Sequence, residues 1–213
     1  DIEKLQQQLS EAEREREVKA LKLTATRKES AQKLSMLLVE EMRPLGMPHV
    51  QISVDVEPCG YYKMGAEQVV VRFSANKNQA LLPVSEVASG GEISRLMLCI
   101  KSLVADAMSL PTIIFDEIDT GVSGDIAARM GSIMHRMAQY MQVVAITHLP
   151  QVAAIGDHHY RVYKDNSGDS THTHLIQLKE EERVEEIARM LSGTTLTEAA
   201  LNNARVLLAS QDQ

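Results

Sequence analysis

The chain has 213 residues, enough for one globular domain with an arm, and 44% of them are hydrophobic and 24% charged. These values exclude a disordered tail or a collagen-like fibre. With no Trp, two Phe, five Tyr and a net charge of −7, the chain is neither a single-strand binder built on base stacking nor a basic DNA clamp. Its two isolated cysteines predict a reducing, cytoplasmic compartment. No apolar run reaches the roughly 18 residues that a membrane helix needs, so we expect no membrane partner.

Residues 1–48 have the composition of a long helix followed by a break. No Gly or Pro occurs before Pro44, and nine basic residues balance nine acidic ones up to that point, so the rest of the chain carries the whole net charge. A heptad seam of apolar residues opens at Ile2, Leu5, Leu9 and Ala12. We expect one strand of a coiled coil whose partner lies elsewhere, although a single solvated helix has the same composition. Because the chain begins at Asp1 rather than Met, we also expect a piece of a longer protein.

After Pro44, Gly46 and Pro48 the hydrophobic pattern becomes that of a mixed α/β domain. Residues 50–57 alternate apolar and polar side chains, as a half-buried strand does, and residues 68–74 complete a hairpin. The remaining pattern predicts, in chain order, a helix over 93–108, a buried strand at 112–115, a helix over 124–141, a buried strand at 143–146, short strands near 160–163 and 174–178, and helices around 181–191 and 197–209. The predicted fold class is α/β, with residues 1–48 as the arm and residues 49–213 as a lobe built on parallel strands.

The tetrapeptide Ser89-Gly90-Gly91-Glu92 opens the first helix after the hairpin. Ser89 and Glu92 have the spacing of a capping box. In that motif the serine hydroxyl accepts a hydrogen bond from the glutamate's backbone amide, and the glutamate side chain accepts one from the serine's backbone amide. The two glycines leave the first-turn amides bare at the positive end of the helix dipole, which favours an anion such as phosphate. A simple helix cap with two glycines is the alternative.

An acidic pair, Asp116-Glu117, ends the first buried strand, where open α/β sheets bind their ligands. Asp116 can hold a metal ion and Glu117 can orient or deprotonate an attacking water. Two solvated acids at a strand end are the alternative. Asp119 follows in a turn, and we expect Ser123 to cap the next helix.

Thr147-His148 ends the second buried strand, 31 residues after Glu117. That separation matches one strand–helix–strand unit, which brings both strand ends to one edge of the sheet. We therefore expect His148 beside the acidic pair. Four other histidines, His158, His159, His172 and His174, invite a metal interpretation, but no Cys or paired acid completes a tetrahedral set and a solvated strand edge is the better account.

These motifs in this order resemble an ABC-type ATPase. Residues 89–92 resemble the ABC signature, residues 113–117 the Walker B strand, Asp119 the D-loop and His148 the switch histidine. The strings VASGGEISRLMLCIKSL, TIIFDEIDTGVSGDIA and ITHLPQVAAIGDHHYRVYKD resemble the C-terminal half of the bacterial RecN family, relatives of the SMC proteins that act in double-strand-break repair. The helical arm before the lobe favours this family over transporter ATPases.

The RecN resemblance implies half of an active site. A Walker A loop ends in Gly-Lys followed by Ser or Thr, and no Gly-Lys dipeptide occurs here, so that loop would lie in an N-terminal lobe outside these residues. Family members bind ATP and Mg²⁺ between two heads of a homodimer. Ser89, Gly90 and Gly91 would then contact the γ-phosphate of the partner head's nucleotide, whereas Asp116, Glu117 and His148 would serve the head's own.

The resemblance also implies a nucleoid-associated cytoplasmic protein that holds DNA through its full-length assembly. This chain by itself is expected to be inactive. Two alternatives stay open: another SMC-like head that acts with a DNA-end nuclease, and a coiled-coil interaction module whose phosphate motifs are vestigial.

Overall fold

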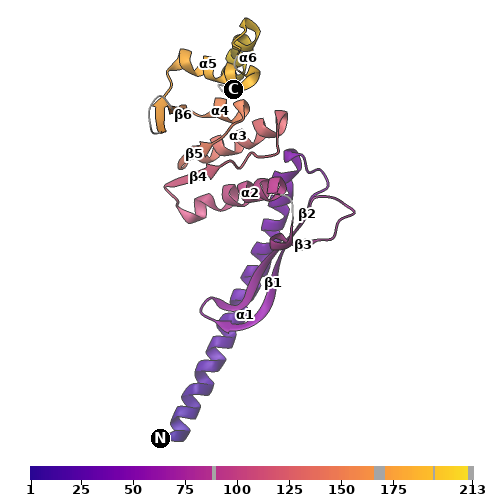
Figure 1. The fold of residues 1–213 in the computed structure, drawn as a ribbon. Coiled ribbons are helices and arrows are strands. Elements are labelled where there is room, and N and C mark those ends of the chain that lie inside the picture. The colour runs from indigo at the N-terminus through magenta and orange to yellow at the C-terminus, as the bar shows by residue number, and fades with distance from the viewer. Residues whose placement is uncertain (88–89, 166–170, 194, 211–213) are drawn as a thin grey trace. The chain divides into compact units, whose positions relative to one another are not determined.

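The computed structural model describes residues 1–87, 90–165, 171–193 and 195–210, which form two compact units, Asp1–Ser89 and Gly90–Gln213 (Figure 1). Each unit has its own core and is described separately. No helix within the described ranges is long and apolar enough to cross a membrane.

The first unit begins with a single long helix, α1 (Ile2–Met42). A 3₁₀ turn (Arg43–Leu45) and Gly46, in the left-handed region at φ 81°, end it where the sequence predicts a break. Side chains of the N-terminal half are solvent-exposed, including Ile2, Leu5 and Leu9 of the expected heptad seam. Burial begins only at Ala31, so the second half of α1 supplies the core of this unit.

A three-stranded antiparallel sheet packs along α1 in the order β1 (Gln51–Tyr62), β2 (Gly65–Ser74) and β3 (Leu82–Pro83), and a 3₁₀ turn (Val84–Glu86) follows it. The alternation at the start of β1 places its apolar side chains toward the helix. The core of the unit consists of buried side chains from both layers: Leu38, Met42, Leu45, Ile52, Val54 and Phe73. Both strands are longer than the sequence predicts, because they extend beyond this core along the exposed part of α1.

The outer end of the hairpin is fixed to α1 by a cluster that we call the hairpin clamp: Thr24, Arg27, Gly65 and Glu67. Glu67 is 5% exposed, accepts a hydrogen bond from the Thr24 hydroxyl and pairs with Arg27 at 3.0 Å. Gly65 has a φ of 130°, which favours glycine, and a Cβ there would lie 2.7 Å from the end of the Arg27 side chain. The clamp is one of the contacts that join the hairpin to α1 in the unit Asp1–Ser89, and the division into an arm up to residue 48 and a lobe after it stays a prediction.

The second unit contains the strand–helix–strand unit that the sequence predicts. Its elements are α2 (Gly90–Met108), β4 (Thr112–Asp116), α3 (Gly124–Ala138), β5 (Gln142–Ile146) and the short helix α4 (Pro150–Ile155). Strands β4 and β5 pair in parallel, with Asp116 opposite Ile146. Buried side chains on the helix side of this sheet include Leu96, Leu98, Cys99, Ile113, Phe115, Met130 and Met134. Ser123 is the N-cap residue of α3, as expected, but its hydroxyl makes no capping hydrogen bond.

The opposite face of the β4–β5 sheet is uncovered. Ile114, Val144 and Ile146 have exposed fractions of 63%, 40% and 51%. The continuous apolar runs predicted strands buried on both faces, and within the described residues of the second unit only one face is covered. Parallel sheets are normally covered on both sides, so these three side chains form an apolar surface that no described element of this unit covers.

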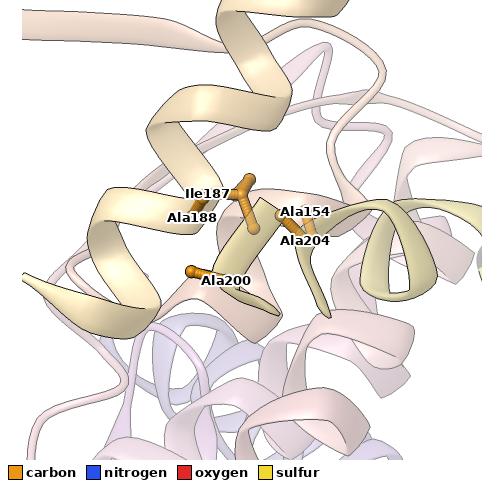
Figure 2. Close-up of a cluster of buried hydrophobic side chains, with 5 residues drawn as sticks. All are labelled: Ala154, Ile187, Ala188, Ala200 and Ala204. Carbon is orange, nitrogen blue, oxygen red and sulfur yellow. The ribbon is translucent and has the colours of Figure 1, made fainter. Parts of the chain in front are cut away.

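The C-terminal segment contributes an antiparallel pair, β6 (Tyr160–Asp165) and β7 (His172–Gln177), and two helices, α5 (Glu180–Ser192) and α6 (Glu198–Ala209). Figure 2 shows where α4, α5 and α6 meet around Ile187. The other buried side chains there are all alanines: Ala154, Ala188, Ala200 and Ala204. Arg183 of α5 donates to the carbonyl oxygen of Ala154 at 2.6 Å and so ties α5 to the end of α4.

Candidate nucleotide site

The carboxyl ends of β4 and β5 bring the predicted acidic and histidine residues to one edge of the sheet. Asp116 and Ile146, the last residues of the two strands, are paired. Glu117 and His148 follow in the adjoining loops, and their side chains and that of Asp116 are solvent-exposed, as groups that meet a ligand must be. The sequence prediction that the two strand ends share one edge is thus confirmed.

Glu117 has an unusual backbone conformation, with φ of 46° in the left-handed region. Its amide donates to the carbonyl oxygen of Ile146 at 3.0 Å, so the β4–β5 ladder continues one residue beyond the strands. Its own carbonyl oxygen accepts from the Thr120 amide at 3.2 Å and from the Thr120 hydroxyl at 2.8 Å. Strained residues held by several bonds are concentrated at functional sites, which fits the predicted role of this carboxylate.

Asp119 has a buried side chain, unlike the exposed Asp116 and Glu117. The sequence places it among the nucleotide-binding residues, but the side chain is only 1% exposed and its Oδ2 accepts a hydrogen bond from the Thr147 hydroxyl. Its Oδ1 is equally buried and accepts no hydrogen bond from the described residues. In this conformation Asp119 connects the β4 loop to the β5 loop, and its contact with nucleotide stays a prediction.

Thr147 is a site residue to which the sequence assigned no role. Its hydroxyl donates to Asp119 and also accepts from the Leu149 amide at 2.9 Å. The sequence shows only that a hydroxyl residue stands directly after a buried strand and before His148. It does not reveal that its hydrogen-bond partner is Asp119, 28 residues earlier in the chain. Such long-range hydrogen bonds leave no periodic trace in a sequence.

The glycine-rich start of α2 lies against the acidic turn. Ser89, which the sequence assigns to the signature, lies outside the described residues, and so does any capping bond that it makes with Glu92. A Cβ on Gly91 would be 3.3 Å from the Thr120 carbonyl oxygen, whereas one on Gly90 would meet nothing within 4 Å. The structure therefore brings Gly91 and the acidic turn together within the second unit.

Arg95 adds a cationic group one turn into α2. A Cβ on Gly91 would lie 3.7 Å from its Nη1, and its Nε is buried and donates no hydrogen bond to any described residue. Burial lowers the pKa of Arg95, and the nearby Glu92 carboxylate partly offsets that effect. The sequence analysis missed Arg95, because its distance from the acidic turn depends on how α2 packs.

The exposed carboxylate of Asp116, at the carboxyl end of β4, can serve as a ligand of a nucleotide-bound Mg²⁺. No group of three or more His, Cys, Asp or Glu residues that could hold a metal occurs within the described ranges. Mg²⁺ beside a nucleotide needs only one or two carboxylates, because phosphate oxygens and waters complete the octahedron, and the exposed Asp116 can supply one.

In the histidine-rich region, His174 stacks on Tyr163 with ring centroids 5.1 Å apart, and burial lowers the pKa of His159.

Curated relatives match nearly the whole chain, although no protein-family model matches it. The DNA repair protein RecN of Deinococcus radiodurans is 44% identical over 191 residues, which are 88% of this chain and 33% of that protein. RecN of Vibrio cholerae is 38% identical over 88% of this chain and 34% of its own length, and RecN of Bacillus subtilis is 33% identical over 100% of this chain and 40% of its own. The chain spans only 33–40% of the length of these three relatives.

Solved SMC heads share the fold. An Smc head with a coiled coil and joint from Pyrococcus yayanosii matches 89% of this chain and 36% of its own at a TM-score of 0.61 and 14% identity. An SMC ATPase chain studied for ATP-driven dimerization and DNA-stimulated activation matches 81% of this chain and 99% of its own at a TM-score of 0.54 and 11% identity. Such low identities establish the fold alone. By sequence and by fold together, this chain belongs to the RecN family and has the architecture of the C-terminal part of an SMC head.

Proposed function

We propose that the chain is the C-terminal part of a RecN-like ATPase that acts in DNA double-strand-break repair. It contributes the signature, Walker B, D-loop and switch histidine to ATP held between two heads of a homodimer. The observation that carries the proposal is the approach of Gly91 to the Thr120 carbonyl at one side of an edge where Asp116, Glu117 and His148 gather. The 33–44% identity to RecN proteins supports it.

Each site residue has a distinct proposed task. Asp116 would hold Mg²⁺, which when bound neutralises charge on the phosphates. Glu117 would orient the attacking water and accept its proton, and His148 would contact the same nucleotide from the neighbouring loop. The bare amides of residues 89–91 would meet the γ-phosphate of the partner head's nucleotide at the positive end of α2.

The proposal also covers what lies outside these residues. Because no Gly-Lys dipeptide is present, the phosphate cradle must come from an N-terminal lobe, and the isolated chain is expected to hydrolyse no ATP. DNA would be held by the full assembly, since this part of the protein is acidic.

Glu117→Gln tests the proposal in a chimera where this chain replaces the matching residues of the Deinococcus radiodurans RecN protein. The amide keeps the size of the side chain but accepts no proton, so the ATP hydrolysis rate should fall about 10²- to 10⁴-fold. ATP affinity should be retained, since Asp116 and the cradle are intact. Steady-state hydrolysis and nucleotide binding are measured on the same preparations.

Glu181→Gln, an exposed position on α5, is the matched control and should hydrolyse ATP like the parent chimera. A parent chimera without ATPase activity, or a Glu117→Gln variant with the parent's rate, would contradict the proposed function.

A further inference from the structure

Two loops of the candidate site are joined beyond the ends of their strands. In the first connection the Glu117 amide donates a hydrogen bond to the Ile146 carbonyl oxygen at 3.0 Å. In the second the Thr147 hydroxyl donates a hydrogen bond to Oδ2 of Asp119. The β4 loop is thus bonded both to the last residue of β5 and to the first residue of the loop after it, beyond the last strand pair, Asp116 with Ile146.

We propose that Asp119 and Thr147 are positioning residues that hold Glu117 and His148 in a fixed relation to each other. The inference rests on the proposed function for the tasks of Glu117 and His148. It adds a task inside the protein to the proposed D-loop role of Asp119, and it assigns a task to Thr147.

The hydrogen bonds of Thr147 enclose His148 on both sides in the chain. Its hydroxyl donates to Asp119 and accepts from the amide of Leu149, so residues 147 and 149 are both anchored. His148 lies between them with an exposed side chain and a constrained backbone. Without the hydroxyl, the Leu149 amide and the Asp119 carboxylate both lose a partner, and the loop gains freedom.

Because Asp119 is buried, loss of the Thr147 hydroxyl should also disturb Glu117. The carboxylate is 1% exposed, and the Thr147 hydroxyl makes its only side-chain hydrogen bond within the described ranges. A buried carboxylate without a partner is costly, so the turn would move to bring it to water. Glu117 lies two residues away at φ of 46° and would relax with the turn.

Three variants of the 213-residue chain test the connection. Thr147→Val removes the hydroxyl at nearly constant shape, and Thr147→Ser keeps it. Thr112→Val is the matched control, because the Thr112 hydroxyl donates to the Gln142 side chain at 3.0 Å across the same two strands at the opposite end of the sheet.

In the chain itself, Thr147→Val should speed amide hydrogen exchange at Glu117 as well as at Leu149, by about tenfold or more, and should shift the His148 ring resonances. Thr147→Ser should restore both readouts, and Thr112→Val should change neither. Unchanged exchange at Glu117 in Thr147→Val, or failure of Thr147→Ser to restore the parent spectrum, would overturn the proposal.

In the RecN chimera, Thr147→Val should lower kcat about 10- to 100-fold with little change in KM for ATP, because the phosphates are bound by other groups. Thr147→Ser should recover most of kcat. A changed KM with normal kcat would overturn the positioning role. A parent chimera without ATPase activity refutes the proposed function instead, and the exchange measurement on the chain still decides whether Asp119 and Thr147 hold the two loops.

Discussion

Glu117 combines a predicted catalytic side chain with a left-handed backbone conformation that favours glycine. At φ of 46° a side chain costs about 1 kcal/mol relative to glycine. Three hydrogen bonds hold this conformation: the Glu117 amide donates to Ile146, and the Glu117 carbonyl oxygen accepts two from Thr120. Glycine would form this turn without the conformational cost but would supply no carboxylate.

Glu117→Gly should therefore be more stable than Glu117→Ala by roughly 1 kcal/mol, because both lose the carboxylate and only alanine keeps the strain. Urea unfolding, followed through amide signals of β4, measures the difference. At Arg129, an exposed residue inside α3, the order should reverse, with alanine about 0.5–1 kcal/mol more stable than glycine. Equal stability of the two Glu117 variants would show that the turn is not strained.

Among the elements, the hairpin clamp makes the attachment of β1–β2 to α1 sensitive to acid. The hydrogen bond from Thr24, with smaller contributions from Arg27, lowers the pKa of Glu67 below its ordinary 4.5. A carboxyl whose pKa is lower in the folded state stabilises that state above its unfolded pKa and loses the contribution as pH falls through the folded value. The attachment should thus be complete at neutral pH and weaken as the pH falls below about 4.5.

A spin label on Cys59 measures this attachment, because Cys59 is exposed on β1 and Cys99 is buried. The label should become more mobile on acidification in the parent chain. In Glu67→Gln it should already be mobile at neutral pH and change much less. Glu13→Gln, on the exposed part of the same helix, should behave like the parent. Identical pH profiles for Glu67→Gln and the parent would exclude the clamp as the cause.

Element types and positions were predictable wherever a hydrophobic period is long and clean. The α1 helix, the paired strands β4 and β5, and the helices α5 and α6 occur within a few residues of the predicted ranges. The hairpin was predicted too short, since residues 58–62 and 65–67 pair above a helix surface that the local pattern does not reveal. The bond between Asp119 and Thr147 joins residues 28 positions apart, and no local pattern encodes it.

At the scale of the molecule, the uncovered face of the β4–β5 sheet should make the chain self-associate. Ile114, Val144 and Ile146 form exposed apolar surface on parallel strands that normally have cover on both sides. Light scattering should show concentration-dependent association, and a dye for apolar surfaces should bind.

Replacing Ile114 and Val144 together with threonine keeps β-branched side chains in the strands and should reduce both signals. Val206→Thr, a single exposed apolar residue on α6, is the control and should change neither. A monomeric parent that binds no dye would mean that this face needs no cover.

The two glycines that open α2 are expected to respond differently to alanine. A Cβ at position 91 would lie 3.3 Å from the Thr120 carbonyl oxygen, so the acidic turn would have to shift by a few tenths of an ångström. A Cβ at position 90 would meet nothing within 4 Å, and alanine suits a helix better than glycine. Packing therefore gives no reason for glycine at position 90, whereas the proposed function gives one, because a phosphate can approach a backbone amide most closely where no side chain covers it.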